Sequence, residues 1–486
     1  MNSKNNFFIL IFFLLFLISV SFIILDISNF SKRHWTSFFD HELTLSYNSL
    51  LFNSGIKHEY VDHSGYFTIL FLSFFYKILD ILNYVNISNF NEFREVNNID
   101  NVLQELIVYA RIFAAGSVSF FLFLVFCTFN YFTKNKIFSF MLLLLVISSL
   151  GSIIHIIQLR TELIAMIFLL LSFLSLRFSF DKQNFSYFIF FLIFFYCSVL
   201  NKSQVFLYLP GILFLAKSNT KSLWKLNLEN FRFITNKNLK FLIIFIIFFY
   251  LILKFYSSSQ KNILSPIFII LTFSFINMFF YYYLKKYNLR IEENLIAINL
   301  CIILSYLLFK NILFIHPSTN EMAFINSFTN LIGNSKYIST DINLIKYIEL
   351  NSYQIILVIF SVIINFIFKN KLSKDQIIFN LNCILIFSFI SLIHLMRPNL
   401  YYFIFSDFFL ILSFCNFSKF FNLKKIFIYL PILVILIYPQ FNVIQKYLNS
   451  IKINQTKVLC KDTYFYDWHK KIKRDKFINF CEQNLN

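Results

Sequence analysis

Long apolar stretches alternate with short polar segments along most of the chain. The first apolar stretch covers 7–25, and a mixed segment at 26–106 follows it. Twelve further stretches are long enough, or nearly so, to cross a bilayer as helices. They cover 108–132, 137–157, 163–176, 187–200, 205–216, 241–255, 263–284, 295–314, 353–368, 377–395, 401–417 and 426–438. This pattern predicts an all-α polytopic membrane protein with about 13 transmembrane helices.

Two early segments decide the topology. No small-x-small cleavage site follows 7–25, which therefore predicts an uncleaved first helix rather than a signal peptide. The 65–82 segment is apolar enough to span, but it contains Lys77 and Asp80, and a crossing there would invert every later loop. We therefore expect 65–82 to lie as a helix in the outer interface.

Composition narrows the class further. The 486 residues are 58% hydrophobic and only 14% charged, with 72 Phe, 6 Gly and 6 Pro, and the mean hydropathy is +0.67. These values exclude a soluble enzyme, a nucleic-acid-binding domain and a disordered chain as the main interpretation. Seven Cys residues are too sparse for a secreted disulfide scaffold.

The net charge of +19 fits a membrane topology better than a nucleic-acid partner. If the N-terminus is cytoplasmic and the spans alternate, each inner loop is basic, as the positive-inside rule expects. These loops hold Lys134 and Lys136, Arg177 and Lys182, the 217–240 segment, Lys285, Lys286 and Arg290, Lys369, Lys371 and Lys374, and Lys419, Lys424 and Lys425. The predicted location is the inner (cytoplasmic) membrane, with the C-terminus periplasmic or extracellular.

Two regions follow from this topology. Residues 1–439 form the transmembrane domain, with 26–106 as its long outer loop, and 440–486 form a polar outer tail. The tail contains Cys460 and Cys481. They either pair in an oxidising compartment or remain free thiols.

The outer loop begins with an acidic cluster, Asp40, His41 and Glu42. The apolar residues after it recur at helical spacing up to Gly55, which suits the position just after a helix. This predicts an amphipathic helix on the outer membrane surface with Asp40 at its N-terminus. Asp40 is then either an N-cap or, beside Glu42, a candidate general base.

A second polar group, with His58, Asp62 and His63, leads into the 65–82 helix. Asp62 is read as a cap for that helix or as part of the site. Asp40, Glu42 and His63 offer ligands for a divalent metal, but their spacing matches no metal signature, and solvated loop polarity explains them as well. No cofactor is otherwise indicated.

Four basic residues stand near the outer ends of predicted spans. They are Arg111, Arg160, Lys202 and Arg397, and Glu162 follows Arg160 closely. Singly, each could snorkel to the interface, and Arg160 with Glu162 could be a structural ion pair. Jointly, beside an acidic loop on the same side, they predict a site that holds a phosphate or pyrophosphate group.

The order of these motifs resembles the GT-C glycosyltransferases, in particular protein O-mannosyltransferases and lipid A aminoarabinose transferases. The matching elements are Asp40-His41-Glu42, Asp62-His63-Ser64-Gly65, Ala110-Arg111, Arg160-Thr161-Glu162, Asn201-Lys202-Ser203 with Leu209-Pro210-Gly211, and Arg397-Pro398-Asn399-Leu400-Tyr401. The likeness covers about the first 220 residues by motif and the rest by topology. The sequence departs from the family where His41 splits the acidic pair and Ser-Gly replaces Pro-Pro.

The resemblance implies a GT-C-like bundle and transfer of a sugar from a polyprenyl phosphate donor. Asp40 would act as base or orient the acceptor, and Glu42 would support it. Lys202, Arg160 and Arg397 would hold the departing lipid phosphate. The acceptor is a lipid, a glycan or a protein, and the sequence identifies neither the sugar, the acceptor nor the oligomeric state.

The main alternative is a membrane transporter or a flippase for lipid-linked glycans. Such a protein would show broken helices near the midplane and a repeat, whereas Gly and Pro are scarce in these spans and no repeat is visible. A polysaccharide polymerase or ligase would more often carry its site in a late outer loop. The 311–349 loop is the candidate here, and its charges are sparse.

Overall fold

The computed structural model describes most of the N-terminal half and the later helices, and every element in this part is helical. The described residues are 3–29, 32–57, 65–182, 185–208, 211–212, 215–216, 352–396, 402–421 and 426–451. Three predicted spans, at 241–255, 263–284 and 295–314, lie outside them, as do Cys460 and Cys481.

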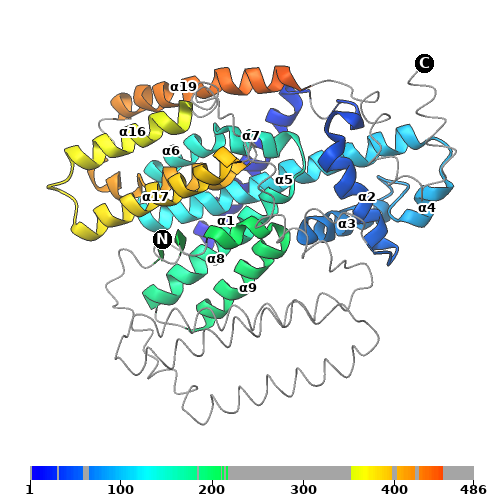
Figure 1. The fold of residues 1–486 in the computed structure, drawn as a ribbon, viewed down its shortest axis with the longest axis horizontal. Helices are drawn as coiled ribbons and strands as arrows, with labels where there is room; N and C mark the ends of the chain where they lie inside the picture. Colours follow the sequence, from blue (N-terminus) through cyan, green and yellow to red (C-terminus); the bar gives the residue numbers. More distant parts are fainter. Residues whose placement is uncertain are drawn as a thin grey trace, which may run out of the picture. The chain divides into compact units, whose positions relative to one another are not determined.

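The described elements follow one another along the chain as helices and short helical turns (Figure 1). They are α1 (Ser3–Ile27), η1 (Trp35–Phe38), the π-helical turn η2 (Phe39–Leu43), α2 (Thr44–Asn53), α3 (Tyr66–Ile81), α4 (Phe90–Glu95), α5 (Ile99–Thr133), α6 (Lys136–Ile147), α7 (Leu150–Ile157), α8 (Thr161–Lys182), α9 (Phe185–Asn201), η3 (Ser203–Tyr208), α16 (Ser352–Ile367), α17 (Lys374–Met396), α18 (Phe403–Leu412), η7 (Cys415–Phe420) and α19 (Ile426–Ser450).

Several of these helices could cross a membrane. Within the described ranges, three are long and apolar enough: α5, α8 and the Phe403–Phe420 stretch of α18 and η7. The pair α6 and α7 forms a fourth if its two parts, bent by 65°, are counted as one broken span. The chain is therefore a helical membrane protein. The larger number of spans expected from the apolar stretches stays a prediction.

The chain divides into two compact units. One contains Met1–Leu171, Cys197–Ser218 and Phe314–Asn486, and the other contains Ser172–Tyr196 and Asn219–Leu313. In the described part of the second unit, α8 and α9 run as a hairpin. Ser172 donates to the Phe191 carbonyl oxygen at 3.3 Å, and Lys182 donates to the Tyr187 hydroxyl at 3.1 Å.

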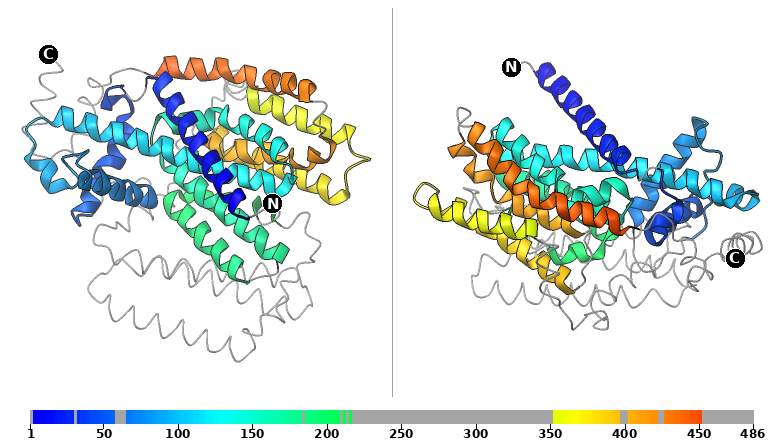
Figure 2. Two further views of the ribbon diagram at one scale, coloured as in Figure 1. Left: turned by 180° about the vertical axis from the view of Figure 1, so that it is seen from behind. Right: turned by 90° about the horizontal axis from the view of Figure 1, so that it is seen from above.

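In the first unit, α5 is the central helix. Helix α1 packs along it, and the two cross in Figure 2. Phe13 and Phe126 meet there with ring centroids 4.4 Å apart. Helix α6 turns back along α5 because Lys134 adopts a left-handed conformation (φ +53°) and Asn135 caps the new helix. The Lys134–Lys136 turn, predicted as an inner loop, is thus a tight helical hairpin.

The bend between α6 and α7 has a local cause. Ser148 closes α6, and the Ser149 side chain accepts from the Ser152 backbone N–H at 3.3 Å, so it begins a new helix in a new direction. Helix α7 then packs against α18 and the end of α19, where Leu150, Ile154, Phe403, Val443 and Ile444 form a small apolar core.

The first loop folds into a compact helical layer on the N-terminal half of α5. Trp35, Leu43, Tyr76 and Phe93 belong to its core, together with Leu106 of α5. The prediction that Gly55 follows the first loop helix is confirmed. Gly55 has φ +69° and donates to the Phe52 carbonyl, while Ile56 donates to the Leu51 carbonyl, which is the Schellman arrangement.

Two expectations for this loop are wrong. Asp40 does not cap α2, because the backbone is already helical from Trp35 onward and the N-cap residue is Leu43, with no side-chain cap. Nor does α2 lie on the surface with one polar face. All residues from Thr44 to Leu51 are buried, and polar ones such as Asn48, Ser49 and Ser46 bond to nearby carbonyls or to the Tyr76 hydroxyl.

The second loop helix forms as predicted, as α3. Its N-cap is Gly65, not Asp62, which lies outside the described residues. One face of α3 packs on α2 through residues such as Leu72 and Tyr76, while Phe74 and Ile81 are exposed on the other. At 16 residues α3 is not among the candidate spans.

Gly65 packs closely against Thr161, so a substitution at this position tests the described backbone. It has φ +48°, and an added Cβ would stand 2.9 Å from Thr161 Cγ2. We expect Gly65→Ala to lower the free energy of unfolding by about 1–2 kcal/mol. Gly116→Ala in α5, where a Cβ meets no atom within 4 Å, should instead stabilise by about 0.5–1 kcal/mol. Thermal unfolding in detergent measures both, and an equal effect of the two variants would contradict the assignment.

Candidate functional site

A buried ion pair joins the first loop to α5. Glu42 Oε2 lies 3.0 Å from Arg111 Nε and 2.9 Å from Arg111 Nη2, and both side chains are fully buried. The other carboxylate oxygen accepts from the Leu159 backbone N–H at 3.2 Å. Glu42 therefore ties three distant parts of the chain together: the loop, α5 and the segment that enters α8.

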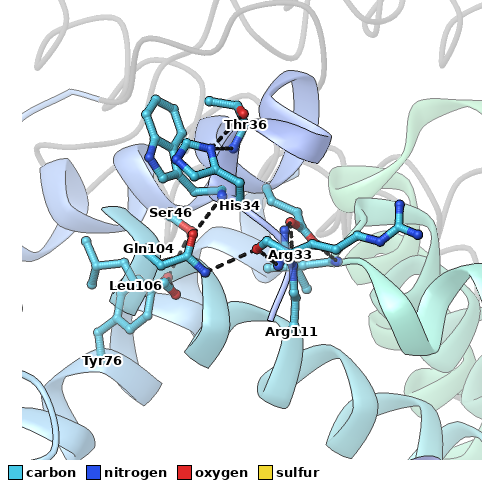
Figure 3. A network of polar contacts seen from close by, with 11 residues as sticks. Arg33, His34, Thr36, Ser46, Tyr76, Gln104, Leu106 and Arg111 are labelled. Carbon is cyan, nitrogen blue, oxygen red and sulfur yellow. Dashed lines mark hydrogen bonds and ion pairs between the residues drawn. The ribbon is translucent and has the colours of Figure 1, made fainter. Parts of the chain in front are cut away.

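The Arg111 guanidinium also reaches the chain just before η1 (Figure 3). It donates to the Arg33 carbonyl at 2.7 Å, and Gln104 donates to the same oxygen at 3.1 Å. Gln104 in turn accepts from the Trp35 backbone N–H at 2.8 Å. The Arg33 side chain extends to the Ile451 carbonyl at 2.9 Å, so the end of α19 is attached to this network.

Burial of these charged groups shifts two pKa values. Burial raises the pKa of the Glu42 carboxyl above its ordinary value, and the Arg111 guanidinium opposes that shift. Partial burial, with the positive charge of Arg111 nearby, lowers the pKa of the Arg33 guanidinium. Glu42 and Arg111 therefore stabilise the fold only together, because removing either one would leave the other charge buried without compensation.

A second cluster lies where α8 begins and α9 ends. Lys202 Nζ is 2.7 Å from Glu162 Oε1, and Arg160 Nε is 3.5 Å from Glu162 Oε2. Arg160 Nη2 donates to His41 Nε2 at 2.7 Å. The Lys202 ammonium also lies 5.3 Å from the centre of the Tyr402 ring. We call Arg160, Glu162 and Lys202 the cation cluster; all three are buried.

The local fold holds this cluster in place. Asn201, the last residue of α9, donates to the Thr161 carbonyl at 2.5 Å, and its side-chain oxygen accepts from the Thr68 backbone N–H at 2.9 Å. The Asn201 carbonyl accepts from the Gly65 N–H at 3.1 Å. Helices α3, α8 and α9 are thus fastened at one point, beside Lys202.

The predicted site residues separate into those that meet and those that are not described. The structure brings His41, Glu42, Arg111, Arg160, Glu162 and Lys202 into two adjoining networks. The Arg160–Glu162 contact anticipated as a structural ion pair is present. The backbone of Asp40 lies in η2, but its side chain lies outside the described residues, as do His58, Asp62, His63 and Arg397.

The described residues offer no metal-binding cluster. Among the described side chains no group of three or more His, Cys, Asp or Glu is arranged to hold an ion. Of the three residues suggested as ligands, the side chains of Asp40 and His63 fall outside that set, and Glu42 is engaged by Arg111.

Sequence reasoning missed three polar residues in apolar stretches. His155 of α7 and Tyr208 of η3 are buried near Glu162, and both interact with it electrostatically. Asp407 is buried in the middle of α18 and accepts from Gln354 Nε2 at 2.9 Å. An ionisable residue within a predicted span is itself a signal of function, so His155 and Asp407 were detectable from the sequence.

In chemical terms the cation cluster brings a guanidinium and an ammonium onto one carboxylate. Arg160 and Lys202 both contact Glu162. Buried cations of this kind favour an anionic ligand, and a guanidinium beside an ammonium suits phosphate oxygens.

The Glu42–Arg111 pair can be tested by a mutant cycle. We expect Arg111→Met to lower the free energy of unfolding by about 3–5 kcal/mol, because it leaves Glu42 buried without its partner. The double variant Glu42→Leu with Arg111→Met should cost less than Arg111→Met alone. Thermal unfolding in detergent measures the cycle, and additive losses would show that the two residues act independently.

Neither protein-family models nor curated proteins give a significant match to this chain.

Proposed function

We propose that the chain is an integral-membrane glycosyltransferase of the GT-C type. It transfers a sugar from a polyprenyl-phosphate donor to a lipid, glycan or protein acceptor on the outer face of the cytoplasmic membrane. The observation that carries the proposal is the buried cation cluster, Arg160, Glu162 and Lys202, held against the acidic first loop.

The cation cluster supports this chemistry because the leaving group of the reaction is a lipid phosphate. Negative charge develops on that phosphate as the glycosidic bond breaks. Cations fixed in a buried site stabilise such charge without reorganising at the moment of reaction. Lys202 and Arg160 are the proposed phosphate ligands, and Arg397 is a third on the basis of the resemblance.

The contact between His41 and Arg160 supports the proposed role of the first loop. His41 lies between Asp40 and Glu42, and its imidazole contacts a cation of the cluster at 2.7 Å. We propose Asp40 as the base or the residue that orients the acceptor. Glu42 and Arg111 then act as positioning residues, because their ion pair fixes the turn η2 that carries Asp40.

An apolar cavity near the predicted inner loops fits the apolar tail, not the head group, of a lipid-linked donor. A cavity of about 320 Å³ opens between α6, α16, η7 and α19, with walls that are almost wholly apolar. Its aromatic wall residues are Phe138, Phe360, Phe368, Phe414, Phe417, Phe420 and Phe421. Such a surface accepts a prenyl chain and offers nothing to the polar head of a nucleotide sugar.

The alternative of a transporter or flippase retains one specific support. The broken pair α6 and α7, bent by 65°, is the kind of interrupted helix from which transporter sites are built. The experiment below separates the two, because a transporter transfers no sugar.

The proposed topology can be checked independently. The N-terminus and the Lys134–Lys136 turn are expected on the cytoplasmic side, with η2 and α3 on the outer side. Reporter fusions after Asn135 and after Ile56 should report inside and outside, respectively. The reverse result would remove the proposed outer site.

We expect Lys202→Met to lower transfer by about 100-fold or more, because the phosphate loses a buried cation. The gene is deleted in its own host and complemented with variants. Lipid-linked sugars, envelope lipids and glycoproteins are then compared by mass spectrometry. Loss of a sugar-sized mass increment, with accumulation of the lipid-linked donor, is the expected result.

Two variants make this comparison specific. Lys202→Arg keeps a cation and should retain part of the activity. Lys182→Met removes an exposed lysine at the end of α8 and should complement fully. A Lys202→Met protein that folds and restores the full glycan profile would overturn the role of the cluster. An unchanged profile in the deletion strain would favour the transporter.

A further inference from the structure

Two buried polar atoms beside the cation cluster lack hydrogen-bond partners among the described residues. They are Nε2 of His155 and the hydroxyl oxygen of Tyr208. Both side chains are almost wholly shielded from solvent, at 0% and 2% exposure. A buried polar atom without a hydrogen-bond partner is unfavourable, so a ligand or water that bonds to these atoms would be stabilised.

Both residues interact electrostatically with Glu162 of the cation cluster. His155 interacts electrostatically with Glu162, Arg160 and Lys202. The Tyr208 ring packs on Phe405, with centroids 5.4 Å apart, and Phe405 stands three residues after Tyr402, whose ring faces Lys202.

The hydrogen bonding of His155 limits what can bind it. Nδ1 lies 2.6 Å from the Gly151 carbonyl oxygen, which can only accept, so Nδ1 carries the proton. In the neutral ring Nε2 is then an acceptor. A phosphate oxygen cannot satisfy it, whereas a hydroxyl group can.

The direction of the His155 ring is fixed by the packing of α7. Gly151 lies so close to α18 that an added Cβ would collide with the backbone of Phe403 and Ile404. Helix α7 therefore has little freedom to shift, and the Gly151 carbonyl holds the ring one turn further along the same helix. The acceptor atom is thus fixed before any ligand arrives.

We propose that His155 accepts, and Tyr208 donates, hydrogen bonds with hydroxyl groups of the donor sugar, beside the phosphate held by Lys202 and Arg160. The inference rests on the proposed function and adds a specificity element to it. A site built to bond a hydroxyl group rejects analogues that lack it more strongly than an apolar pocket can. Bound water is the competing explanation, since water could satisfy the same two atoms.

The test compares a lipid phosphate with and without a sugar. Binding of farnesyl phosphate and of farnesyl phosphate linked to glucose, galactose, mannose or arabinose is measured by calorimetry on the full chain in detergent. Wild type should bind at least one sugar-linked probe more tightly than farnesyl phosphate. Tyr208→Phe and His155→Asn should each weaken binding of that probe by about five- to tenfold and leave farnesyl phosphate within about twofold. The Asn amide can still donate to the Gly151 carbonyl.

Tyr353→Phe is the matched control, because the Tyr353 hydroxyl is equally buried but donates to the Leu145 carbonyl at 2.7 Å. It should lower the melting temperature and leave both affinities unchanged. Tyr208→Phe should not lower the melting temperature of the ligand-free protein. If His155→Asn fails to fold, Tyr208→Phe decides the result, since Phe keeps the contact with Phe405.

The outcomes distinguish failure of the sugar contacts from failure of the proposed function. If wild type gains nothing from any sugar, or Tyr208→Phe keeps the full gain, the two atoms bind water only and the inference is wrong. In both cases binding of farnesyl phosphate that depends on Lys202 would leave the proposed function standing. If wild type binds no probe, the proposed function fails and the inference fails with it.

Discussion

The position of the first loop depends on one buried ion pair, Glu42 with Arg111. Removing both charges from water is costly, and the geometry offsets that cost only while every contact is made. The carboxylate receives two guanidinium contacts and one backbone N–H, from Leu159, while the guanidinium also reaches the Arg33 carbonyl. Glu42 is 69 positions from Arg111 and 117 positions from Leu159, so these contacts hold the first loop against distant helices.

The same turn serves the candidate site. Glu42 and His41 are neighbours in η2, yet one contacts Arg111 and the other contacts Arg160. A π-helical turn widens the spacing of side chains around the axis, and such turns are frequent at functional positions. The ion pair holds the turn, and the turn brings an acidic segment beside the cation cluster. Structural and chemical roles are thereby divided between adjacent residues.

Most described helices coincide with predicted apolar stretches, because a membrane imposes long, continuous hydrophobic runs. The exceptions are 137–157, which is a bent pair of helices, and 205–216, which begins in the short 3-10 helix η3. Gly55 was also predictable, since few residues adopt its left-handed conformation. The partner of Arg111 was not: Glu42 is 69 positions away, and no periodicity links them. The burial of α2 was missed for a related reason. Asn48 and Ser49 look solvent-facing in the sequence but donate to the Thr44 and Leu45 carbonyls.

The long reach of Glu42 has a consequence for how the chain is made. When Glu42 is synthesised, neither Arg111 nor Leu159 has yet been made, because they follow it by 69 and 117 positions. The Glu42 carboxylate can gain its full set of partners only after the start of α8 has been made. The contacts of the first loop are therefore completed late in the synthesis of the first third of the protein. An early truncation would release a loop whose charge has nowhere to be buried.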